Sequence, residues 1–166
     1  MGVLRKILDA SGITPEGIGM LFQGHTIASI KKMDQQLLDA IYGLGHQNYQ
    51  NEKFEKARGI MRYLCIQDHT NAEYFAALGA CEYRLQNYEA AQIILEEAVN
   101  MDPQDPRPIL NLSLCMIKNK NKKQAKALMQ VAEQLSADKS EFNREWRLAS
   151  RILEGSGKKK QPKSEG

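Results

Sequence analysis

The chain has 166 residues, 42% of them hydrophobic and 26% charged, which suffices for one domain with a packed core and argues against general disorder. Lys and Arg number 23 against 20 Asp and Glu, but residues 155–166 alone account for the surplus of +3. A strongly basic nucleic-acid-binding face is therefore not indicated, and no apolar run approaches the ~20 residues that span a membrane.

A helical leader is expected over residues 1–33. Apolar residues from Val3 to Leu8 predict a short amphipathic helix over Val3–Ala10, and Thr14-Pro15 reads as the N-cap and first residue of another helical turn. The leader could pair two copies of the chain as a weak homodimer or pack on the segment that follows. The sequence leaves both arrangements open.

The segment after the leader is predicted to be all-α. Leu37, Leu38, Ile41 and Leu44 have helical spacing and follow Asp34, which is a good N-cap. Proline is absent from residues 16–102 and 109–161, so long stretches lack the strongest helix breaker. No alternating run of β-branched and aromatic residues predicts a strand.

A repeat of 34 residues organises the middle of the chain. Leu44-Gly45 recurs as Leu78-Gly79 and then as Leu112-Ser113, and Cys81 recurs as Cys115. A period of 34 with Leu-Gly, aromatic, Ala and Pro positions is the tetratricopeptide pattern of stacked helix pairs. The three units are Leu38–Asn71, Ala72–Asp105 and Pro106–Lys139.

Small residues at fixed positions explain the spacing. We expect Gly79 and Ala91 to let the two helices of a unit approach closely, and Ala98 to let the next unit pack. Leu44, Leu78 and Leu112 are expected to be used in packing within their units.

The region after the third unit is expected to end the stack. Asp138 with Glu141 resembles a capping box, and the apolar spacing from Phe142 to Leu153 predicts one amphipathic capping helix. Residues 155–166 are rich in Gly, Ser, Lys and Pro and are predicted to be disordered. The expected division is thus a leader at 1–33, repeats with a capping helix at 34–154, and a basic tail at 155–166.

Catalytic and metal chemistry are poorly supported. The three histidines, His25, His46 and His69, lack metal-site spacing, and the cysteines lack a C-x-x-C motif. Cys81 and Cys115 share a repeat position, which favours structural burial. We therefore expect no enzyme, no cofactor and no metal, and three unpaired cysteines without a secretory signal fit a reducing cytoplasm.

The sequence resembles the class II chaperones of bacterial type III secretion, the SycD-like group, which hold translocator proteins before export. The resemblance covers roughly residues 4–154. The local sequences that carry it are Gly12-Ile13-Thr14, Leu37-Leu38-Asp39-Ala40-Ile41-Tyr42, Gln47-Asn48-Tyr49, Phe54-Glu55-Lys56-Ala57, Leu64-Cys65-Ile66-Gln67-Asp68-His69, Leu78-Gly79-Ala80-Cys81 and Ala137-Asp138-Lys139.

The resemblance implies a bacterial cytoplasmic chaperone whose concave groove takes an extended apolar segment near the N-terminus of a translocator. It implies neither nucleic-acid binding nor direct membrane insertion. The groove residues that it places on the first helix of each unit are Tyr42, His46, Tyr49, Ala76, Ala80, Tyr83, Leu110, Leu114 and Ile117. His46 departs from the family pattern, because an apolar residue is usual at that position.

The residues themselves support a groove in part. These positions form a second stripe at spacings of three and four, which is more apolar surface than one packed face needs. Three alternatives stay open. The stripe could only complete inter-repeat packing, or Lys118–Lys126 could bind an acidic or RNA partner of a general repeat adaptor. A clamp for a peptide carboxylate could use Arg107 and Asn111, the only suitable pair.

Overall fold

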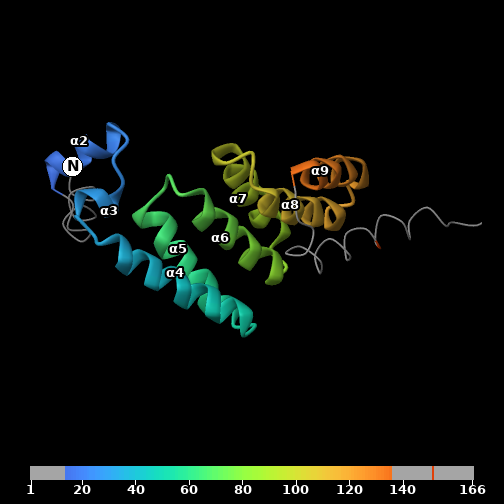
Figure 1. Ribbon diagram of the computed structural model, residues 1–166, viewed down its shortest axis with the longest axis horizontal. Coiled ribbons are helices and arrows are strands. Elements are labelled where there is room, and N and C mark those ends of the chain that lie inside the picture. Colours follow the sequence, from blue (N-terminus) through green and yellow to red (C-terminus); the bar gives the residue numbers. More distant parts are fainter. Residues whose placement is uncertain (1–13, 136–150, 152–166) are drawn as a thin grey trace, which may run out of the picture.

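A computed structural model describes residues 14–135 and 151, and in this part all regular structure is helical, which confirms the all-α prediction (Figure 1). The helix predicted at residues 3–10, the capping helix and the basic tail lie outside the described residues. The helices are α2 (Pro15–Phe22), α3 (Ile27–Ile30), α4 (Gln35–Gln50), α5 (Phe54–Gln67), α6 (Ala72–Arg84), α7 (Tyr88–Met101), α8 (Pro106–Lys118) and α9 (Lys122–Leu135).

The described part of the leader holds two short helices. The Thr14 hydroxyl accepts a hydrogen bond from the Gly17 amide at 3.2 Å, so Thr14 caps α2 and Pro15 begins it, as predicted. The second helix, α3, was not predicted; Thr26 caps it in the same way. Ala28 of α3 is buried against the first repeat, because α3 packs on α5.

Three helix pairs follow, namely α4 with α5, α6 with α7, and α8 with α9, and each packs on the next (Figure 1). Each pair is joined by a tight turn whose middle residue has a left-handed backbone, with φ of 58° at Glu52, 65° at Gln86 and 64° at Lys120. These residues are 34 apart and none is glycine. Left-handed backbone is costly for residues other than glycine, so the packing of the two helices imposes this turn.

Close approach of the paired helices depends on small residues, as the sequence predicted. A Cβ atom added to Gly79 of α6 would lie 2.5 Å from Cγ of Leu95 on α7. Ala91 and Ala98 on the same helix are fully buried. In the first pair, a Cβ on Gly45 would lie 2.6 Å from Cε of Met61.

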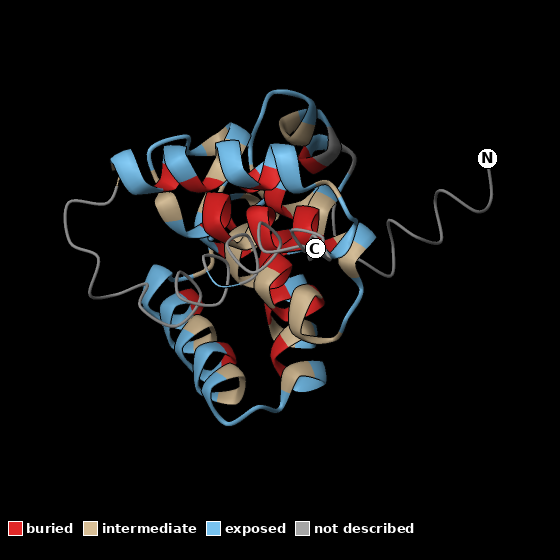
Figure 2. Ribbon diagram, turned by 90° about the vertical axis from the view of Figure 1, so that its right-hand side faces the viewer, coloured by how far each residue is buried: buried red, intermediate tan, exposed pale blue. Residues whose placement is uncertain are grey.

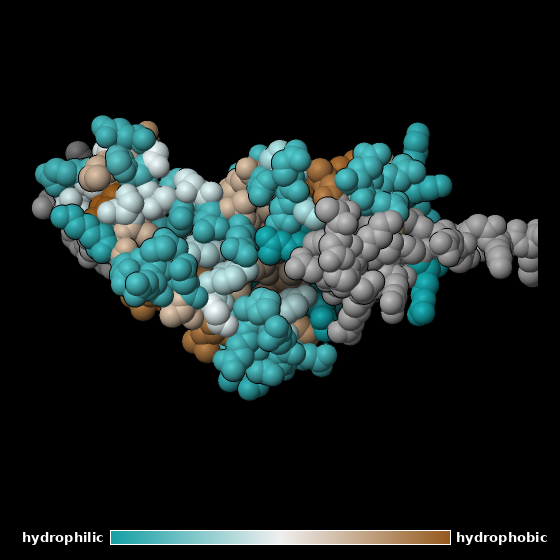
Figure 3. Space-filling view, in the orientation of Figure 1, coloured by the Kyte–Doolittle hydropathy of each residue, from teal (hydrophilic) through white to brown (hydrophobic). Residues whose placement is uncertain are grey.

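The prediction that Leu44 is used in packing is wrong. Leu78 and Leu112 are 6% and 4% exposed, whereas Leu44 is 52% exposed. In the second and third units, α6 and α8 pack on the second helix of the preceding unit. Among the described helices no repeat unit precedes α4 and only α5 and α6 pack on it, so Leu44 and Leu37 face outward. Apolar surface accordingly appears along the edge formed by α4 (Figure 3).

The core is divided into two clusters along the stack, with buried residues on the facing sides of the helices (Figure 2). One cluster joins α3 to α6 and the other joins α7 to α9. A buried carboxylate, Glu82 of α6, accepts hydrogen bonds from Arg62 of α5 at 3.2 Å and from Asn87 at 2.7 Å. These bonds tie the first unit to the turn of the second.

Candidate functional site

The first helices of the three units, α4, α6 and α8, line a cavity with a volume of about 280 Å³. Its lining residues are Tyr42, His46, Tyr49, Met61, Glu73, Ala76, Ala77, Ala80, Cys81, Arg107, Leu110 and Asn111. This volume lies just below the ~300–1,000 Å³ range of ligand pockets, so the cavity suits a few side chains of a larger ligand.

Repeat register explains why these side chains meet. Tyr42, Ala76 and Leu110 occupy the same position in successive units, and His46 and Ala80 share another. Because the first helices lie side by side with α6 in the middle, equal positions face one concavity. Small residues on α6 leave the space that Tyr42 and Leu110 border.

Six of the nine residues expected in a groove lie in the cavity lining: Tyr42, His46, Tyr49, Ala76, Ala80 and Leu110. The other three are placed elsewhere. Leu114 and Ile117 are 1% and 8% exposed and belong to the core cluster of α7–α9. Tyr83 packs against that cluster, with its ring 5.6 Å from that of Tyr88.

Tyr42 contacts two other aromatic rings near the cavity. Its ring centroid lies 5.6 Å from that of Tyr74 on α6 and 6.4 Å from that of His46, one turn along α4. The pKa of Tyr42 is raised to about 12, first by burial and then by the charge and the hydrogen bond of the nearby Glu73 carboxylate. The phenol is therefore protonated at neutral pH and can act as a donor.

The opposite end of the cavity is fixed by an aromatic and cationic cluster. The ring of Tyr49 meets that of Phe54 edge-on at 5.4 Å, and the guanidinium of Arg84 lies 4.2 Å from the Phe54 ring centroid. Arg84 also lies 5.7 Å from the Tyr49 ring centroid and 3.7 Å from Glu52. Tyr49 is thereby oriented by contacts from both α5 and α6.

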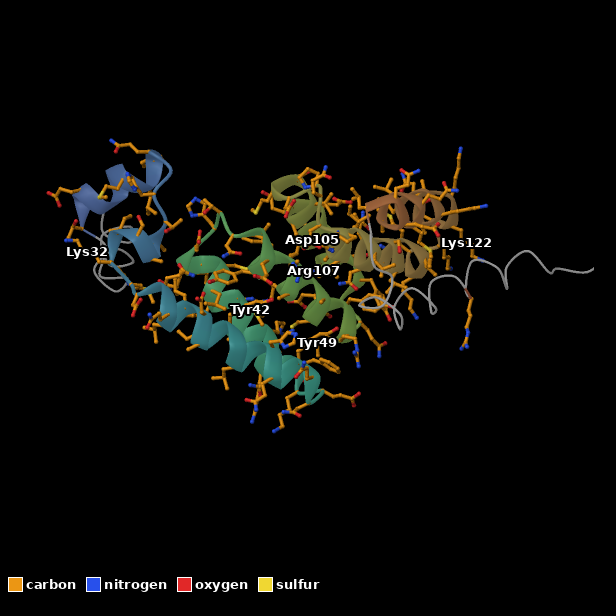
Figure 4. The ribbon with its side chains drawn as sticks, viewed as in Figure 1. Lys32, Tyr42, Tyr49, Asp105, Arg107 and Lys122 are labelled. Carbon is orange, nitrogen blue, oxygen red and sulfur yellow. The ribbon has the colours of Figure 1, made fainter. Side chains whose placement is uncertain are left out.

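The cavity also has a polar end, which includes Arg107 and Asn111, the pair that the sequence offered for a carboxylate clamp, and Glu73, which the sequence did not indicate. Arg107 lies at the start of α8, above Tyr42 in the view of Figure 4, and contacts Glu73 of α6 at 3.4 Å and Asp105 at 2.8 Å. Asn111 lies one turn further along α8 and completes this end. Glu73 and Arg107 are 34 residues apart, so applying the repeat period to charged residues would have paired them.

The remaining chemistry gives no support to catalysis. Within residues 14–135 and 151, no group of three His, Cys, Asp or Glu residues is arranged to hold a metal ion. Burial raises the pKa of each cysteine thiol, at Cys65, Cys81 and Cys115, to about 12, which opposes nucleophilic thiolate formation. The Asp68 carboxylate accepts hydrogen bonds from the amide and hydroxyl of Thr70 in the turn between two units.

The basic cluster of Lys118, Lys120, Lys122, Lys123 and Lys126 lies away from the cavity. These residues occupy the end of α8, the following turn and the start of α9, and Lys122 is at the far end of the repeat stack in Figure 4. Lys118 lies 5.7 Å from the ring centroid of Tyr88. In the described part of the chain, no helix has the length and apolar character needed to cross a membrane.

The fold and the cavity together define a tetratricopeptide-repeat protein with a concave binding site. The family model of the tetratricopeptide repeat matches residues 82–144. Low calcium response locus protein H of Yersinia pestis is 30% identical over 142 residues, which are 86% of this chain and 84% of that protein.

Solved structures agree with this relationship. The translocator chaperone SycD of Yersinia enterocolitica superposes with a TM-score of 0.68 at 28% identity, over 79% of this chain and 98% of SycD. SycD in complex with a peptide of the translocator YopD gives a TM-score of 0.65 at 28% identity, over 74% of this chain and 94% of that one. The chain belongs to the SycD-like family of type III secretion translocator chaperones.

Proposed function

We propose that this chain is a cytoplasmic chaperone that binds an extended apolar segment near the N-terminus of type III translocator proteins. Binding in the concave cavity keeps these substrates soluble and competent for export. The observation that carries the proposal is that three first helices, α4, α6 and α8, line one cavity with aromatic and small apolar side chains in repeat register. The peptide complex of SycD supports the same assignment.

The cavity suits a short extended segment better than a folded surface. Its volume of about 280 Å³ admits a few side chains, and the aromatic residues Tyr42 and Tyr49 are of the type that dominates binding energy at interfaces. An extended segment leaves its backbone groups exposed to water or to polar residues at the rim, so an apolar cavity need not bury unpaired amides. The rest of the translocator can then stay unfolded.

The proposal also assigns roles to the parts of the chain. Residues 34–154 form the binding unit, residues 1–33 form a leader that can mediate a weak homodimer, and residues 155–166 form a basic tail. We assign the binding groove to Tyr42, His46, Tyr49, Ala76, Ala80, Tyr83, Leu110, Leu114 and Ile117. Tyr83, Leu114 and Ile117 contribute from behind the lining, since they pack in or against the adjacent core. The role includes no catalysis, cofactor, metal, nucleic acid or membrane insertion.

Co-expression of the tagged chain with the translocators of the same bacterium tests this function. Ala80→Glu should reduce co-purified translocator by at least tenfold, because binding would have to desolvate the new carboxylate inside the cavity. The matched control is Ala127→Glu, which adds the same charge at an exposed position of α9 and should leave co-purification unchanged. Circular dichroism establishes that both variants stay helical.

Salt dependence separates the groove from the basic cluster. Binding through an apolar cavity should persist as salt rises, whereas an acidic or RNA partner bound at Lys118–Lys126 should dissociate steeply. Normal co-purification by Ala80→Glu, together with its loss when Lys120 and Lys123 are replaced by Gln, would refute the groove proposal.

A further inference from the structure

The polar end of the cavity carries a charge pattern that the apolar lining does not explain. Glu73 and Arg107 share one repeat position, and the corresponding residue of the first unit is Asp39. Asp39 lies one turn before Tyr42 on α4, and Glu73 and Arg107 lie in the first turns of α6 and α8. A charged row therefore runs beside the row of Tyr42, Ala76 and Leu110, with two acids and one base.

Arg107 is held mainly by Asp105 and neutralises Glu73 only weakly. Its Nε donates to both carboxylate oxygens of Asp105 at 3.0 Å, and its Nη2 lies 2.8 Å from Oδ2. Hydrogen bonding to Asp105 is accordingly the main cause of the raised pKa of Arg107. The contact with Glu73 is a single one, from Nη1 at 3.4 Å.

Carboxylate charges act on two tyrosines at this end, the half-buried Tyr42 and the buried Tyr74. After burial itself, the charge of Glu73 is the largest contribution to the raised pKa of Tyr42. Burial also raises the pKa of Tyr74, and the charges of Asp39, Asp68 and Glu73 add to it. Tyr42 and Tyr74 lie on facing helices with ring centroids 5.6 Å apart, so carboxylates affect both sides of this end of the cavity.

We propose that Glu73 is a specificity-determining residue that pairs with a Lys or Arg side chain of the bound segment, next to the segment's apolar anchors. This inference rests on the proposed function and states which apolar segments the cavity prefers. Glu73 lines the cavity, its side chain is 47% exposed, and its contact with Arg107 is long. A cationic side chain of the ligand would balance the part of the negative charge of Glu73 that Arg107 does not neutralise.

The opposite preference, in which Arg107 binds an acidic ligand residue, is disfavoured by the same geometry. The carboxylate of Asp105 caps α8 by accepting the backbone amide of Arg107 at 2.9 Å, and its side chain is 12% exposed. Since Nε and Nη2 of Arg107 are held by Asp105, an acidic ligand residue could reach Arg107 only through Nη1, where the carboxylate of Glu73 would repel it. Glu73 lies in the first turn of α6, and its partners are a single 3.4 Å contact from Arg107 and a hydrogen bond with Tyr42, which leave its half-exposed carboxylate room to accept a cation from the ligand.

An oriented peptide library tests the inference. The immobilised chain selects from short synthetic peptides in which two Leu residues are fixed and the other positions are random, and mass spectrometry identifies the retained sequences. Lys and Arg should be enriched over Asp and Glu at one position near a fixed Leu. Purified peptides that differ only there should bind about two- to fivefold more tightly with Lys than with Gln, as for a partly exposed ion pair.

Matched variants assign the preference to one residue. Glu73→Gln should abolish the enrichment of basic residues while Leu-containing peptides are still retained. Glu89→Gln is the control, because Glu89 is also an acid in the first turn of a helix, α7, but lies outside the cavity lining. It should bind as the unaltered chain does.

The possible outcomes separate the two proposals. Retention of no peptide would contradict the proposed function itself. Retention of peptides without charge preference, or with a preference for acids that Arg107→Gln removes, would overturn the role of Glu73 and leave the groove intact. Enrichment of basic residues that survives Glu73→Gln would overturn it as well.

Discussion

Replacing Gly79 by Ala should destabilise the protein more than the same change at any other glycine of the repeat helices. The added Cβ would lie 2.5 Å from Cγ and 2.7 Å from Cδ2 of Leu95. Real Cβ atoms do not approach other carbons so closely, so α6 and α7 must separate or Leu95 must move. Leu95 is fully buried, which leaves its side chain no open space to enter.

The cost follows from the behaviour of overpacked cores. Adding a methyl group to a well-packed site lowers the free energy of unfolding by about 1–3 kcal/mol, and the better helix propensity of Ala raises it by about 0.5–1 kcal/mol. We expect a net loss of about 1–2 kcal/mol, which lowers Tm by roughly 2–8 °C in a chain of this size. Thermal and urea unfolding followed by circular dichroism measure both quantities.

Two other glycines provide graded controls. A Cβ on Gly45 would meet Cε of Met61, the mobile end of a flexible side chain, so Gly45→Ala should cost less than Gly79→Ala. Nothing lies within 4 Å of a Cβ on Gly43, inside α4, so Gly43→Ala should raise stability by about 0.5–1 kcal/mol through helix propensity alone.

A double-mutant cycle identifies the partner. In a Leu95→Ala background, the space around residue 79 is open, and Gly79→Ala should become neutral or stabilising. If Gly79→Ala instead raises Tm as much as Gly43→Ala does, the conclusion that α6 and α7 approach closely at residue 79 is wrong.

Three further results are expected. Gln86→Gly should raise the free energy of unfolding by about 0.5–1 kcal/mol, seen as a higher urea midpoint, because glycine adopts the left-handed backbone of this turn without the penalty that Gln incurs; a lower midpoint would contradict this. Glu82→Ala should cost about 1–3 kcal/mol in urea unfolding, since Asn87 loses a buried acceptor, and an unchanged midpoint would count against that bond. The thiols of Cys81 and Cys115, whose pKa burial raises from 9.0 to about 12, should resist Ellman's reagent at pH 8 until urea is added. Their contribution to stability should be intact below pH 9 and lost as the pH rises towards 12, and alkaline unfolding followed by circular dichroism checks this sign.

The repeat architecture could be predicted because its determinants are local and periodic. Gly79 and Ala91 are small because two helices touch there, and Thr14 and Asp34 have side chains that cap helices. At such positions the residue type alone indicates the structural role. The burial predicted for Leu44 is wrong because burial at this repeat position also requires the second helix of a preceding unit. In the described part of the chain, the first unit packs on no second helix of a preceding unit, and the repeat pattern alone does not indicate which unit is the first of the stack.

The cavity was only partly predictable for a related reason. The repeat position tells which face of a helix a residue occupies, but it does not tell how strongly the stack curves at each unit. Leu110 and Leu114 are both buried in the core cluster of α7–α9, but only Leu110, one turn earlier on α8, also lines the cavity. The sequence offered Arg107 and Asn111 as a carboxylate clamp but not Glu73, because the groove was expected from apolar residues, although the period also relates Glu73 to Arg107.

The placement of the cavity has a consequence for how the molecule unfolds. Among the described helices, α4 and α8 do not pack on each other. The first unit packs on the second only through α6, so every packing contact that links the first unit to the third passes through α6. Such a stack resembles a one-dimensional chain of neighbours, in which an end unit can open while the others stay folded. A ligand in the cavity touches residues of α4, α6 and α8 at once and adds the missing coupling between the ends. Without ligand, the units should unfold one after another from the ends of the stack. With ligand bound, the three units should unfold together in one cooperative transition, so the bound substrate would stabilise the fold of its chaperone.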